Sequence, residues 1–336
     1  MKKVLVTGHL GYIGAHLVPL LQKNGHHVTG CDIGLFEGCE WELLPRANQE
    51  LKKDYRALTA KELYGFDCVM HLAAISNDPM GNLNPEITYS NNREGSIDLA
   101  VKCKKAGIPR FLFSSSCSIY GQGVNMDLEE TDATRPLSPY AVSKIDTETA
   151  LMKMADETFC PVYLRNATAY GHSPSLRTDL VVNNLLGCAV ARGEIHINSD
   201  GQSWRPLIHC KDIARAFVAI LEAPVGSVHN QIINIGGSKE NFKVKNVAGH
   251  VQELLPNAKI VYTGKVGEDP RNYRVKFDKL NKLLPEFHLA YTLESGMKEL
   301  FEKYKEHNFG IEDFEGDQFI RLNILSKRYK LLRNDI

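Results

Sequence analysis

Short apolar runs recur through the first half of the chain, and polar turns or longer stretches with helical spacing separate them. Apolar residues at helical spacing follow in residues 15–21 and in residues 85–106. Strands that alternate with helices in this way pair in parallel through right-handed crossovers. The pattern therefore predicts an α/β fold, a Rossmann-type doubly wound parallel sheet. The runs that predict its strands are residues 4–6, 27–31, 51–55, 67–72, 110–114 and 162–165.

The pattern loosens after about residue 170. Short strands at residues 195–197, 207–209 and 232–235 alternate with helices near residues 180–192, 212–221 and 245–255. We expect a large sheet domain in residues 1–170, with returning segments near 207–235. A smaller C-terminal α/β domain follows in residues 171–206 and 236–310, and then a tail, 311–336. The tail shows no pattern tied to chemistry, and we interpret its basic residues Lys327, Arg328, Lys330 and Arg333 as a solvated helix face.

Three glycines, Gly8, Gly11 and Gly14, connect the first strand to the first helix. A helix N-terminus carries unpaired N–H groups and partial positive charge, which suit a pyrophosphate. Asp32 ends the second strand, where a carboxylate can accept both ribose hydroxyls of an adenosine and repels a 2′-phosphate. No arginine follows it directly, so the pattern favours NAD over NADP. A tight turn in another kind of α/β protein would also use three glycines, but it would not need the strand, helix and acid around them.

Hydroxyl groups cluster where the fifth predicted strand ends, in residues 114–118, and these serines are either site residues or turn formers. Ser138 is a good N-cap for the next helix, which places Tyr140 and Lys144 one turn apart on one face. A phenol needs a pKa shift of about three units, or about 4 kcal/mol, to act as a base near pH 7. One positive charge ~4 Å away supplies that much at an effective dielectric near 20. We therefore expect Lys144 to lower the pKa of Tyr140.

Composition narrows the classes of protein. The chain has 336 residues, 43% apolar and 24% charged, with a formal net charge of zero, which argues against a nucleic-acid partner held by bulk positive charge. No apolar run approaches the ~20 residues of a membrane span. The chain enters its first strand without signal-peptide features, and its eight cysteines include no C-x-x-C pair. We expect a cytoplasmic protein with reduced thiols, no membrane segment and no metal site.

Taken together, these motifs resemble those of the extended short-chain dehydrogenase/reductases. The branch they resemble is the nucleotide-sugar epimerase/dehydratase family, of the UDP-galactose 4-epimerase type. The resemblance covers about residues 2 to 300. It is carried by the glycine triplet, Asp32, HLAA at 71–74, SSSCSIYG at 114–121, YAVSK at 140–144 and GQSWRPLIH at 201–209.

The resemblance implies roles for individual residues. Ser116 would be the catalytic serine, Tyr140 the base and Lys144 the ribose-binding lysine. It also implies a homodimer formed through the helices near residues 85–106 and 140–157. The substrate would be a nucleotide sugar, with NAD bound by the large domain and the substrate by the small one. The expected NAD site comprises Gly8, Gly11, Tyr12, Ile13, Gly14, Asp32, Asp54, Tyr55, Leu72, Ala73, Ala74, Asn91, Ser114, Tyr140 and Lys144. The expected substrate site comprises Ser76, Ser116, Thr168, Asn183, Arg205 and Arg271, with Arg274 as a competitor of Arg271 and a surface ion pair as the alternative for the arginines.

Two departures from the family pattern bear on the reaction. Dehydratases of the family carry an acidic pair after the catalytic serine or threonine, whereas this chain has Cys117 and Ser118. Epimerases have an asparagine where this chain has Thr168, so the sugar and the carbon stay open, as does the nucleotide base. The sequence predicts an NAD-dependent nucleotide-sugar epimerase. The alternatives are a keto-sugar reductase or sugar-nucleotide dehydrogenase, and a non-catalytic NAD-binding sensor.

Overall fold

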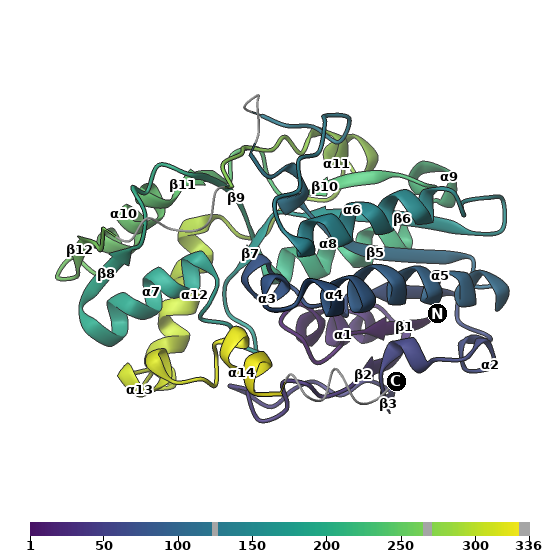
Figure 1. Cartoon of the computed structure of the whole chain (residues 1–336), viewed down its shortest axis with the longest axis horizontal. Helices are drawn as coiled ribbons and strands as arrows, with labels where there is room; N and C mark the ends of the chain where they lie inside the picture. The colour runs from purple at the N-terminus through teal and green to yellow at the C-terminus, as the bar shows by residue number, and fades with distance from the viewer. Residues whose placement is uncertain (123–126, 265–270, 329–336) are drawn as a thin grey trace.

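The computed structural model describes residues 1–122, 127–264 and 271–328. Seven strands form one sheet in the order β10-β6-β5-β4-β1-β2-β3, and every neighbouring pair is parallel (Figure 1). This confirms the predicted doubly wound sheet. The strands are β1 (Lys3–Thr7), β2 (His27–Asp32), β3 (Gln49–Lys52), β4 (Cys68–His71), β5 (Arg110–Ser116), β6 (Cys160–Asn166) and β10 (Ile232–Ile235).

Both faces of this sheet are buried, which is why its strands read as continuous apolar runs. Val4 and Val6 of β1 pack in the same cluster as residues of α1 (Gly14–Lys23) and α8 (Cys210–Glu222). Leu5, between them, faces the opposite side and packs with residues of α5 (Gly95–Lys105) and α6 (Pro139–Met152). Side chains in a strand alternate between faces, so one short run contributes to both cores.

Three local predictions differ from the structure. The helix expected over 85–106 is one helical segment made of α4 (Pro85–Thr88), a π-helical stretch (Tyr89–Glu94) and α5. The third strand, expected at 51–55, lies earlier, at β3. The residues at 76–79, SNDP, are of types common in turns, which predicts a turn there, but α3 (Asp78–Leu83) begins at this place. The Asn77 side chain caps α3 by accepting a hydrogen bond from Met80 N at 2.8 Å, and proline is tolerated in a first helical turn.

A second group of elements packs around its own apolar cluster, which includes Leu186, Val251 and Leu300. The predicted domain boundaries stay a prediction. The strands of this group are β7 (Thr168–Tyr170), β8 (Glu194–Ile197), β9 (Trp204–His209), β11 (Asn241–Lys243) and β12 (Lys259–Tyr262), and its helices are α7 (Val181–Arg192), α10 (Val244–Leu254) and α12 (Leu293–Glu306). Shorter helices are α2 (Ala60–Leu63), α9 (Val225–Val228), α11 (Asp278–Leu283) and α13 (Ile311–Glu315).

The C-terminal helix α14 (Arg321–Arg328) returns toward the large sheet and lies beside the segment that follows β2 (Figure 1). Its Leu325 is buried in a small cluster with Ile75 and Met80. Arg328 donates a hydrogen bond to the carbonyl of Leu35 at 2.8 Å. The interpretation of a solvated basic face is therefore wrong for Arg328, whereas the side chain of Lys327 is 64% exposed. Lys330 and Arg333 lie outside the described residues.

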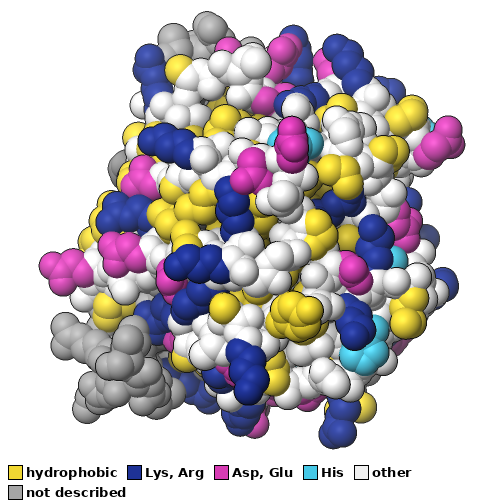
Figure 2. Space-filling view, turned by 90° about the vertical axis from the view of Figure 1, so that its right-hand side faces the viewer, with side chains coloured by type: hydrophobic (Ala, Val, Ile, Leu, Met, Phe, Trp, Pro, Cys, Tyr) yellow, Lys and Arg dark blue, Asp and Glu magenta, His cyan; other side chains and the backbone are white. Residues whose placement is uncertain are grey.

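Charges of both signs are mixed on the face shown in Figure 2, in keeping with the formal net charge of zero. Within the described residues, no helix combines the length and apolarity that a membrane span requires.

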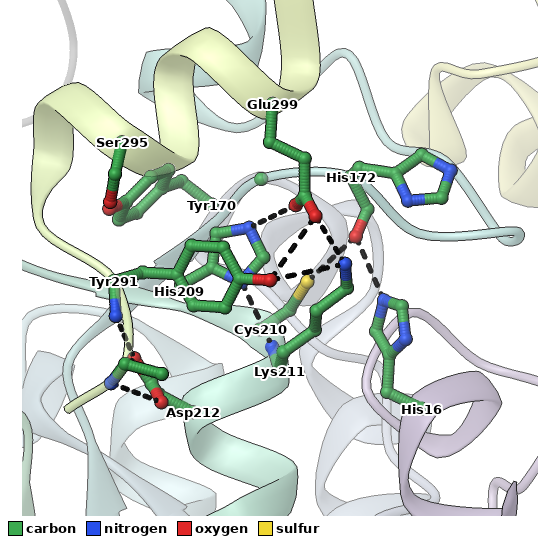
Figure 3. A network of polar contacts seen from close by, with 12 residues as sticks. His16, Tyr170, His172, His209, Cys210, Lys211, Asp212, Tyr291, Ser295 and Glu299 are labelled. Carbon is green, nitrogen blue, oxygen red and sulfur yellow. Dashed lines mark hydrogen bonds and ion pairs between the residues drawn. The ribbon is translucent and has the colours of Figure 1, made fainter. Parts of the chain in front are cut away.

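A buried polar cluster joins α12 to the end of β9 and the start of α8 (Figure 3). Glu299 of α12 lies 2.5 Å from Lys211 Nζ through Oε1 and 3.2 Å from His209 Nε2 through Oε2. The ring of Tyr291 stacks on His209, with centroids 3.9 Å apart. Burial alone would raise the pKa of Glu299, but the hydrogen bonds from His209 and Lys211 outweigh it and lower this pKa to about 2.

The same cluster extends to α1. The carbonyl of His172 accepts from Cys210 Sγ at 3.1 Å, and His16 Nε2 of α1 lies 2.8 Å from the same oxygen. Asp212 accepts hydrogen bonds from the backbone N–H groups of Ala290, at 2.9 Å, and Tyr291, at 3.0 Å. Side chains and backbone from α1, β9, α8 and the segment before α12 thus meet at one place, which fixes the second group of elements against the large sheet.

We predict that Glu299→Gln lowers the stability of the protein at pH 7, and that the stability gap to wild type narrows as the pH falls. A carboxyl whose folded-state pKa is depressed stabilises the fold above its unfolded pKa, and this contribution is lost between about pH 4.5 and pH 2. Denaturant midpoints at pH 7, 5 and 3.5 measure the gap. Glu302→Gln, which removes a half-exposed pair with Lys305 on the same helix, is the control. A gap that stays constant with pH would contradict the assignment.

Candidate active site

A cavity of about 570 Å³ opens where the strands of the large sheet end, a volume typical of ligand sites. In parallel sheets, ligands bind at the carboxyl ends of the strands. All the residues predicted for the NAD site line this cavity. So do Ser76, Ser116, Thr168, Arg205 and Arg271 of the predicted substrate site. The structure thus brings together residues from segments far apart in the sequence.

The glycine loop is packed too closely for side chains. Gly8 has φ +75°, and a Cβ there would lie 2.7 Å from Ala73 N. A Cβ on Gly14 would lie 2.4 Å from the Gly8 carbonyl oxygen. No side chain caps the N-terminus of α1, whose N-cap residue is Ile13. The N–H groups of Ala15 and His16 bond to the carbonyls of Gly11 and Ile13, at 2.9 and 3.0 Å. The start of α1 therefore offers an anionic ligand in the cavity mainly the partial positive charge of the helix terminus.

Asp32 lines the cavity beside this loop. Its carboxylate accepts hydrogen bonds from Gly34 N at 2.9 Å and Leu10 N at 3.4 Å. Burial raises the pKa of Asp32, and the two backbone N–H groups lower it. The backbone therefore fixes the direction of the carboxylate, and its remaining lone pairs can accept ribose hydroxyls.

The hydroxyl, phenol and amine predicted for catalysis come from adjacent elements. Ser116 ends β5, and its hydroxyl lies close enough to the phenol of Tyr140, at the start of α6, to lower the pKa of that phenol. Ser138 caps α6 as predicted, accepting from Ala141 N at 3.1 Å. Lys144 Nζ donates to the carbonyl of Ser114 at 2.7 Å and lies 5.7 Å from the centroid of the Tyr140 ring.

Electrostatics at this pair differ from the prediction. Burial raises the pKa of Tyr140 to about 12, although the nearby hydroxyl of Ser116 acts in the other direction. Burial lowers the pKa of Lys144 to about 7. The prediction that Lys144 brings the phenol's pKa toward neutrality is therefore wrong for the protein by itself. The ammonium is directed at the Ser114 carbonyl, and burial opposes the charged form of both groups.

Asp78 is a cavity carboxylate that the sequence reasoning missed. It accepts hydrogen bonds from the hydroxyl of Ser138 and from Arg271 Nη1, the latter at 2.6 Å. The negative charge of Asp78 raises the pKa of Tyr140. The signal for α3 is an Asn N-cap with Pro79 in the first turn, and the same residue types are common in turns, so the sequence alone does not single out this helix.

A second ion pair in the cavity wall was also missed. Arg177 Nη2 lies 2.7 Å from Asp179 Oδ2, and Arg177 Nη1 donates to Ser76 Oγ at 3.1 Å. The guanidinium lowers the pKa of Tyr140, so it lies near the predicted base. The segment around Arg177 has neither helix nor strand, and no motif in the sequence pointed to it.

The predicted diphosphate ligands separate in the structure. Asn183 is buried, and its amide bonds to Gly171 N at 2.9 Å and to the Arg177 carbonyl at 2.8 Å, so its side chain does not reach the cavity wall. The neighbouring Asn184 does line it. Arg271 lines the cavity, whereas Arg274 pairs with Asp127 at 2.8 Å and stands over the Trp204 ring.

Three buried polar atoms in this wall lack hydrogen-bond partners among the described residues: Asn166 Oδ1, Ser118 Oγ and Arg321 Nη1. Buried polar groups are normally paired, so these atoms indicate a polar ligand. With the start of α1 at Gly14 and the carboxylate of Asp32, the wall fits a dinucleotide. The N-terminus of α1 would hold its diphosphate, Asp32 its adenosine ribose, and Tyr140 and Lys144 its second ribose.

Comparison with known families agrees with this geometry. The profile of the NAD dependent epimerase/dehydratase family matches residues 4–236. The chain belongs to this family. It is therefore an NAD-dependent enzyme of the extended short-chain dehydrogenase/reductase type, as its motifs suggested.

Relatives in this family act on nucleotide sugars. The chain is 30% identical over 271 residues to a UDP-glucose 4-epimerase of Neisseria meningitidis serogroup C, covering 71% of this chain and 78% of the relative. It is 28% identical over 323 residues to a UDP-glucuronate 4-epimerase of Thermodesulfobacterium geofontis, covering 90% and 96%. A solved UDP-glucuronic acid 4-epimerase of Bacillus cereus, in complex with UDP-glucuronic acid and NAD, is 27% identical. Its TM-score is 0.78, and the match covers 90% of this chain and 99% of that one.

We predict that Lys144→Met stabilises the protein relative to wild type at pH 6.5 and that this advantage shrinks toward pH 10. The pKa of Lys144 is about 7 in the folded protein, against an ordinary value of 10.5. Between these two pH values the unfolded chain binds more protons than the folded chain, so the stability of wild type rises with pH. The catalytic rate of the Lys144→Met variant should be lower than that of wild type by ~100-fold or more, as expected when a group that assists proton transfer is lost.

Denaturant unfolding at pH 6.5, 8 and 9.5 gives the stability difference, with Lys153→Met as the control because Lys153 is exposed at the end of the same helix. The assignment of a buried lysine with a lowered pKa fails if Lys144→Met is less stable than wild type at pH 6.5 and its stability relative to wild type is no better at pH 6.5 than at pH 9.5.

Proposed function

We propose that this protein is a nucleotide-sugar epimerase, which inverts a hydroxyl-bearing carbon of its substrate and leaves NAD unchanged after each turnover. The observation that carries the proposal is the shared cavity. Ser116, Tyr140 and Lys144 line this cavity, and Arg205 and Arg271 line it as well. A reacting hydroxyl and a diphosphate would each meet groups of suitable chemistry.

The chain's own groups handle the proton. Tyr140 takes the proton of the reacting sugar hydroxyl and later gives it back, while the hydroxyl of Ser116 hydrogen-bonds the same oxygen and holds it in one position. Bound NAD supplies the hydride chemistry at the carbon that bears this oxygen. Because the Tyr140 phenol is protonated at neutral pH in the protein alone, its deprotonation requires positive charge brought by the ligands.

The polar groups beside Ser116 favour epimerisation over dehydration. Loss of water needs an acid and a base near the leaving hydroxyl. Cys117 instead donates its thiol to the carbonyl of Arg165 at 3.1 Å, and burial raises the pKa of this thiol. Asp78 accepts from Ser138 and Arg271, so both of its oxygens are already engaged as acceptors. These contacts support the interpretation made from the residues at 117 and 118.

The diphosphate side of the substrate is assigned to Arg271 and Arg205. Arg271 is ion-paired with Asp78 at 2.6 Å, and Arg205 Nη1 donates to the carbonyl of Arg271 at 2.5 Å. Guanidinium groups pair with phosphate oxygens through parallel hydrogen bonds, so a diphosphate competes directly with Asp78 for Arg271. Since the relatives named above act on UDP-sugars, UDP-hexoses are the first substrates to test.

A homodimer through α6 and the helical segment that ends in α5 stays a prediction, as does a cytoplasmic location. Gel filtration with light scattering measures the first of these.

We predict that Tyr140→Phe reduces epimerisation of a UDP-hexose by at least ~100-fold while bound NAD is retained, because the phenol moves the proton and the ring packing is unchanged. Product is measured by chromatography of the sugar nucleotide, and NAD content by absorbance after denaturation. Tyr64→Phe, at an exposed tyrosine, is the control.

Absorbance at 340 nm separates this reaction from its alternatives. Epimerisation forms product with no net change at 340 nm, whereas a reductase or dehydrogenase changes the absorbance in proportion to product. A non-catalytic sensor would bind NAD and convert none of a panel of nucleotide sugars. Activity of Tyr140→Phe within a few-fold of wild type would remove Tyr140 as the base.

A further inference from the structure

A cationic side chain from the C-terminal helix reaches the cofactor end of the cavity. Arg321 is the first residue of α14, and it is only 3% exposed. It lines the same cavity as Gly11, Tyr12 and Asp32. It lies far beyond the residues that match the family profile, which end at 236. The tail therefore contributes to a site that sequence motifs assigned to the first half of the chain alone.

Only part of this guanidinium is used by the protein. Nη2 donates to the hydroxyl of Ser175 at 2.7 Å, and the planar group lies 4.5 Å over the centroid of the Phe36 ring. Nη1 is buried and has no hydrogen-bond partner within the part of the chain that the structure describes. An unpaired N–H group on a buried cation is costly, so its place in a cavity wall indicates an acceptor that the cavity receives.

The neighbours of Arg321 locate it along the dinucleotide. The N–H of Ser175 donates to Ser173 Oγ at 3.2 Å, and the Ser173 hydroxyl donates to the carbonyl of Tyr12 at 2.8 Å, in the loop that leads into α1. On its other side, the guanidinium lowers the pKa of the Asp32 carboxyl. Arg321 thus shares the cavity wall with the loop that leads into α1 and with the carboxylate expected to hold the adenosine ribose.

We propose that Arg321 binds the diphosphate of NAD, opposite the N-terminus of α1. The inference rests on NAD as the cofactor and is independent of whether the enzyme epimerises its substrate. A diphosphate carries two negative charges and many acceptor oxygens. The helix terminus supplies partial positive charge from one side, and Arg321 supplies a full positive charge and an unused N–H donor from the other.

Electrostatics agree with an anion at this place. Burial, together with the nearby charge of Arg177, lowers the pKa of Arg321 to about 10, so two cations face one region of the cavity. The ion pair with Asp179 partly compensates Arg177. Among the described residues, no carboxylate lies within ion-pairing distance of Arg321. The guanidinium remains protonated at neutral pH.

The tail holds this arginine in position by packing that is separate from the guanidinium. Leu325 is buried against Ile75 and Met80, and Arg328 donates to the Leu35 carbonyl. The carbonyl of Phe319, a buried aromatic residue, accepts from Thr178 N at 3.0 Å. These contacts anchor the segment on both sides of Arg321, so its side chain can be changed while the anchors stay.

The experiment compares NAD, ADP and adenosine as ligands of the full chain, by titration calorimetry of wild type and Arg321→Met. Loss of a charge-assisted hydrogen bond to phosphate is expected to weaken NAD and ADP by ~10- to 100-fold, and adenosine by less than ~3-fold. Arg321→Lys should fall between wild type and Arg321→Met for ADP, because it keeps the charge and loses the fork. Raising the salt should weaken ADP binding more steeply in wild type than in Arg321→Met.

Arg328→Met is the matched control, because it removes a tail-to-loop hydrogen bond from the same helix without touching the cavity; its ADP affinity should stay within ~3-fold of wild type. Ser175→Ala, which frees Nη2 while leaving the charge, should weaken ADP less than Arg321→Met does. Near-UV circular dichroism confirms that each variant keeps its tertiary packing.

Several results would overturn the proposal. Unchanged ADP and NAD affinity in Arg321→Met would show that the guanidinium is only a structural contact. Equal weakening of adenosine and ADP would assign the effect to the ribose end or to loss of the tail packing. Weakening of NADP but not of NAD would assign Arg321 to a 2′-phosphate.

Discussion

The close contact of β1, the glycine loop and β4 sets the position of the rest of the site. A Cβ on Gly8 would strike the backbone of Ala73, and one on Gly14 would strike the loop itself, so α1 can begin only as close to the sheet as it does. That contact places the start of α1 at the cavity, whose wall also includes Leu72, Ala73 and Ala74. The ends of β2, β5 and β6 meet the same space because all the strands are parallel.

Burial then acts on the reacting groups in one consistent sense: it opposes charge. It raises the pKa of Tyr140 to about 12 and lowers that of Lys144 to about 7, so the pair is poised to gain charge only when ligand charges compensate it. Elsewhere in the wall, oppositely charged side chains lie in pairs, Arg177 with Asp179 and Arg271 with Asp78. The site therefore separates groups that hold ligands from groups that change protonation.

The sequence predicted what depends on local pattern. Strands buried on both faces read as apolar runs, the glycine spacing marked the start of α1, and Ser138 marked the start of α6. It could not predict which side chains satisfy each other across the fold. Asn183 was predicted as a substrate ligand, but its side-chain amide hydrogen-bonds the backbone of Gly171 and Arg177. Lys144 donates a hydrogen bond to the Ser114 carbonyl. Arg321 was missed because the tail carries no motif, and only the fold brings it beside Asp32.

The position of α14 has a consequence for synthesis. A chain emerges from the ribosome with its N-terminus first, so the glycine loop and the strands can begin to pack early. The wall of the cavity formed by α14, however, is translated long after the glycine loop. The complete cofactor site therefore forms only once α14 has been translated and can pack against the large sheet. A tag fused directly behind α14 would be attached to the wall of that site, whereas one at Met1, which is almost fully exposed, would not.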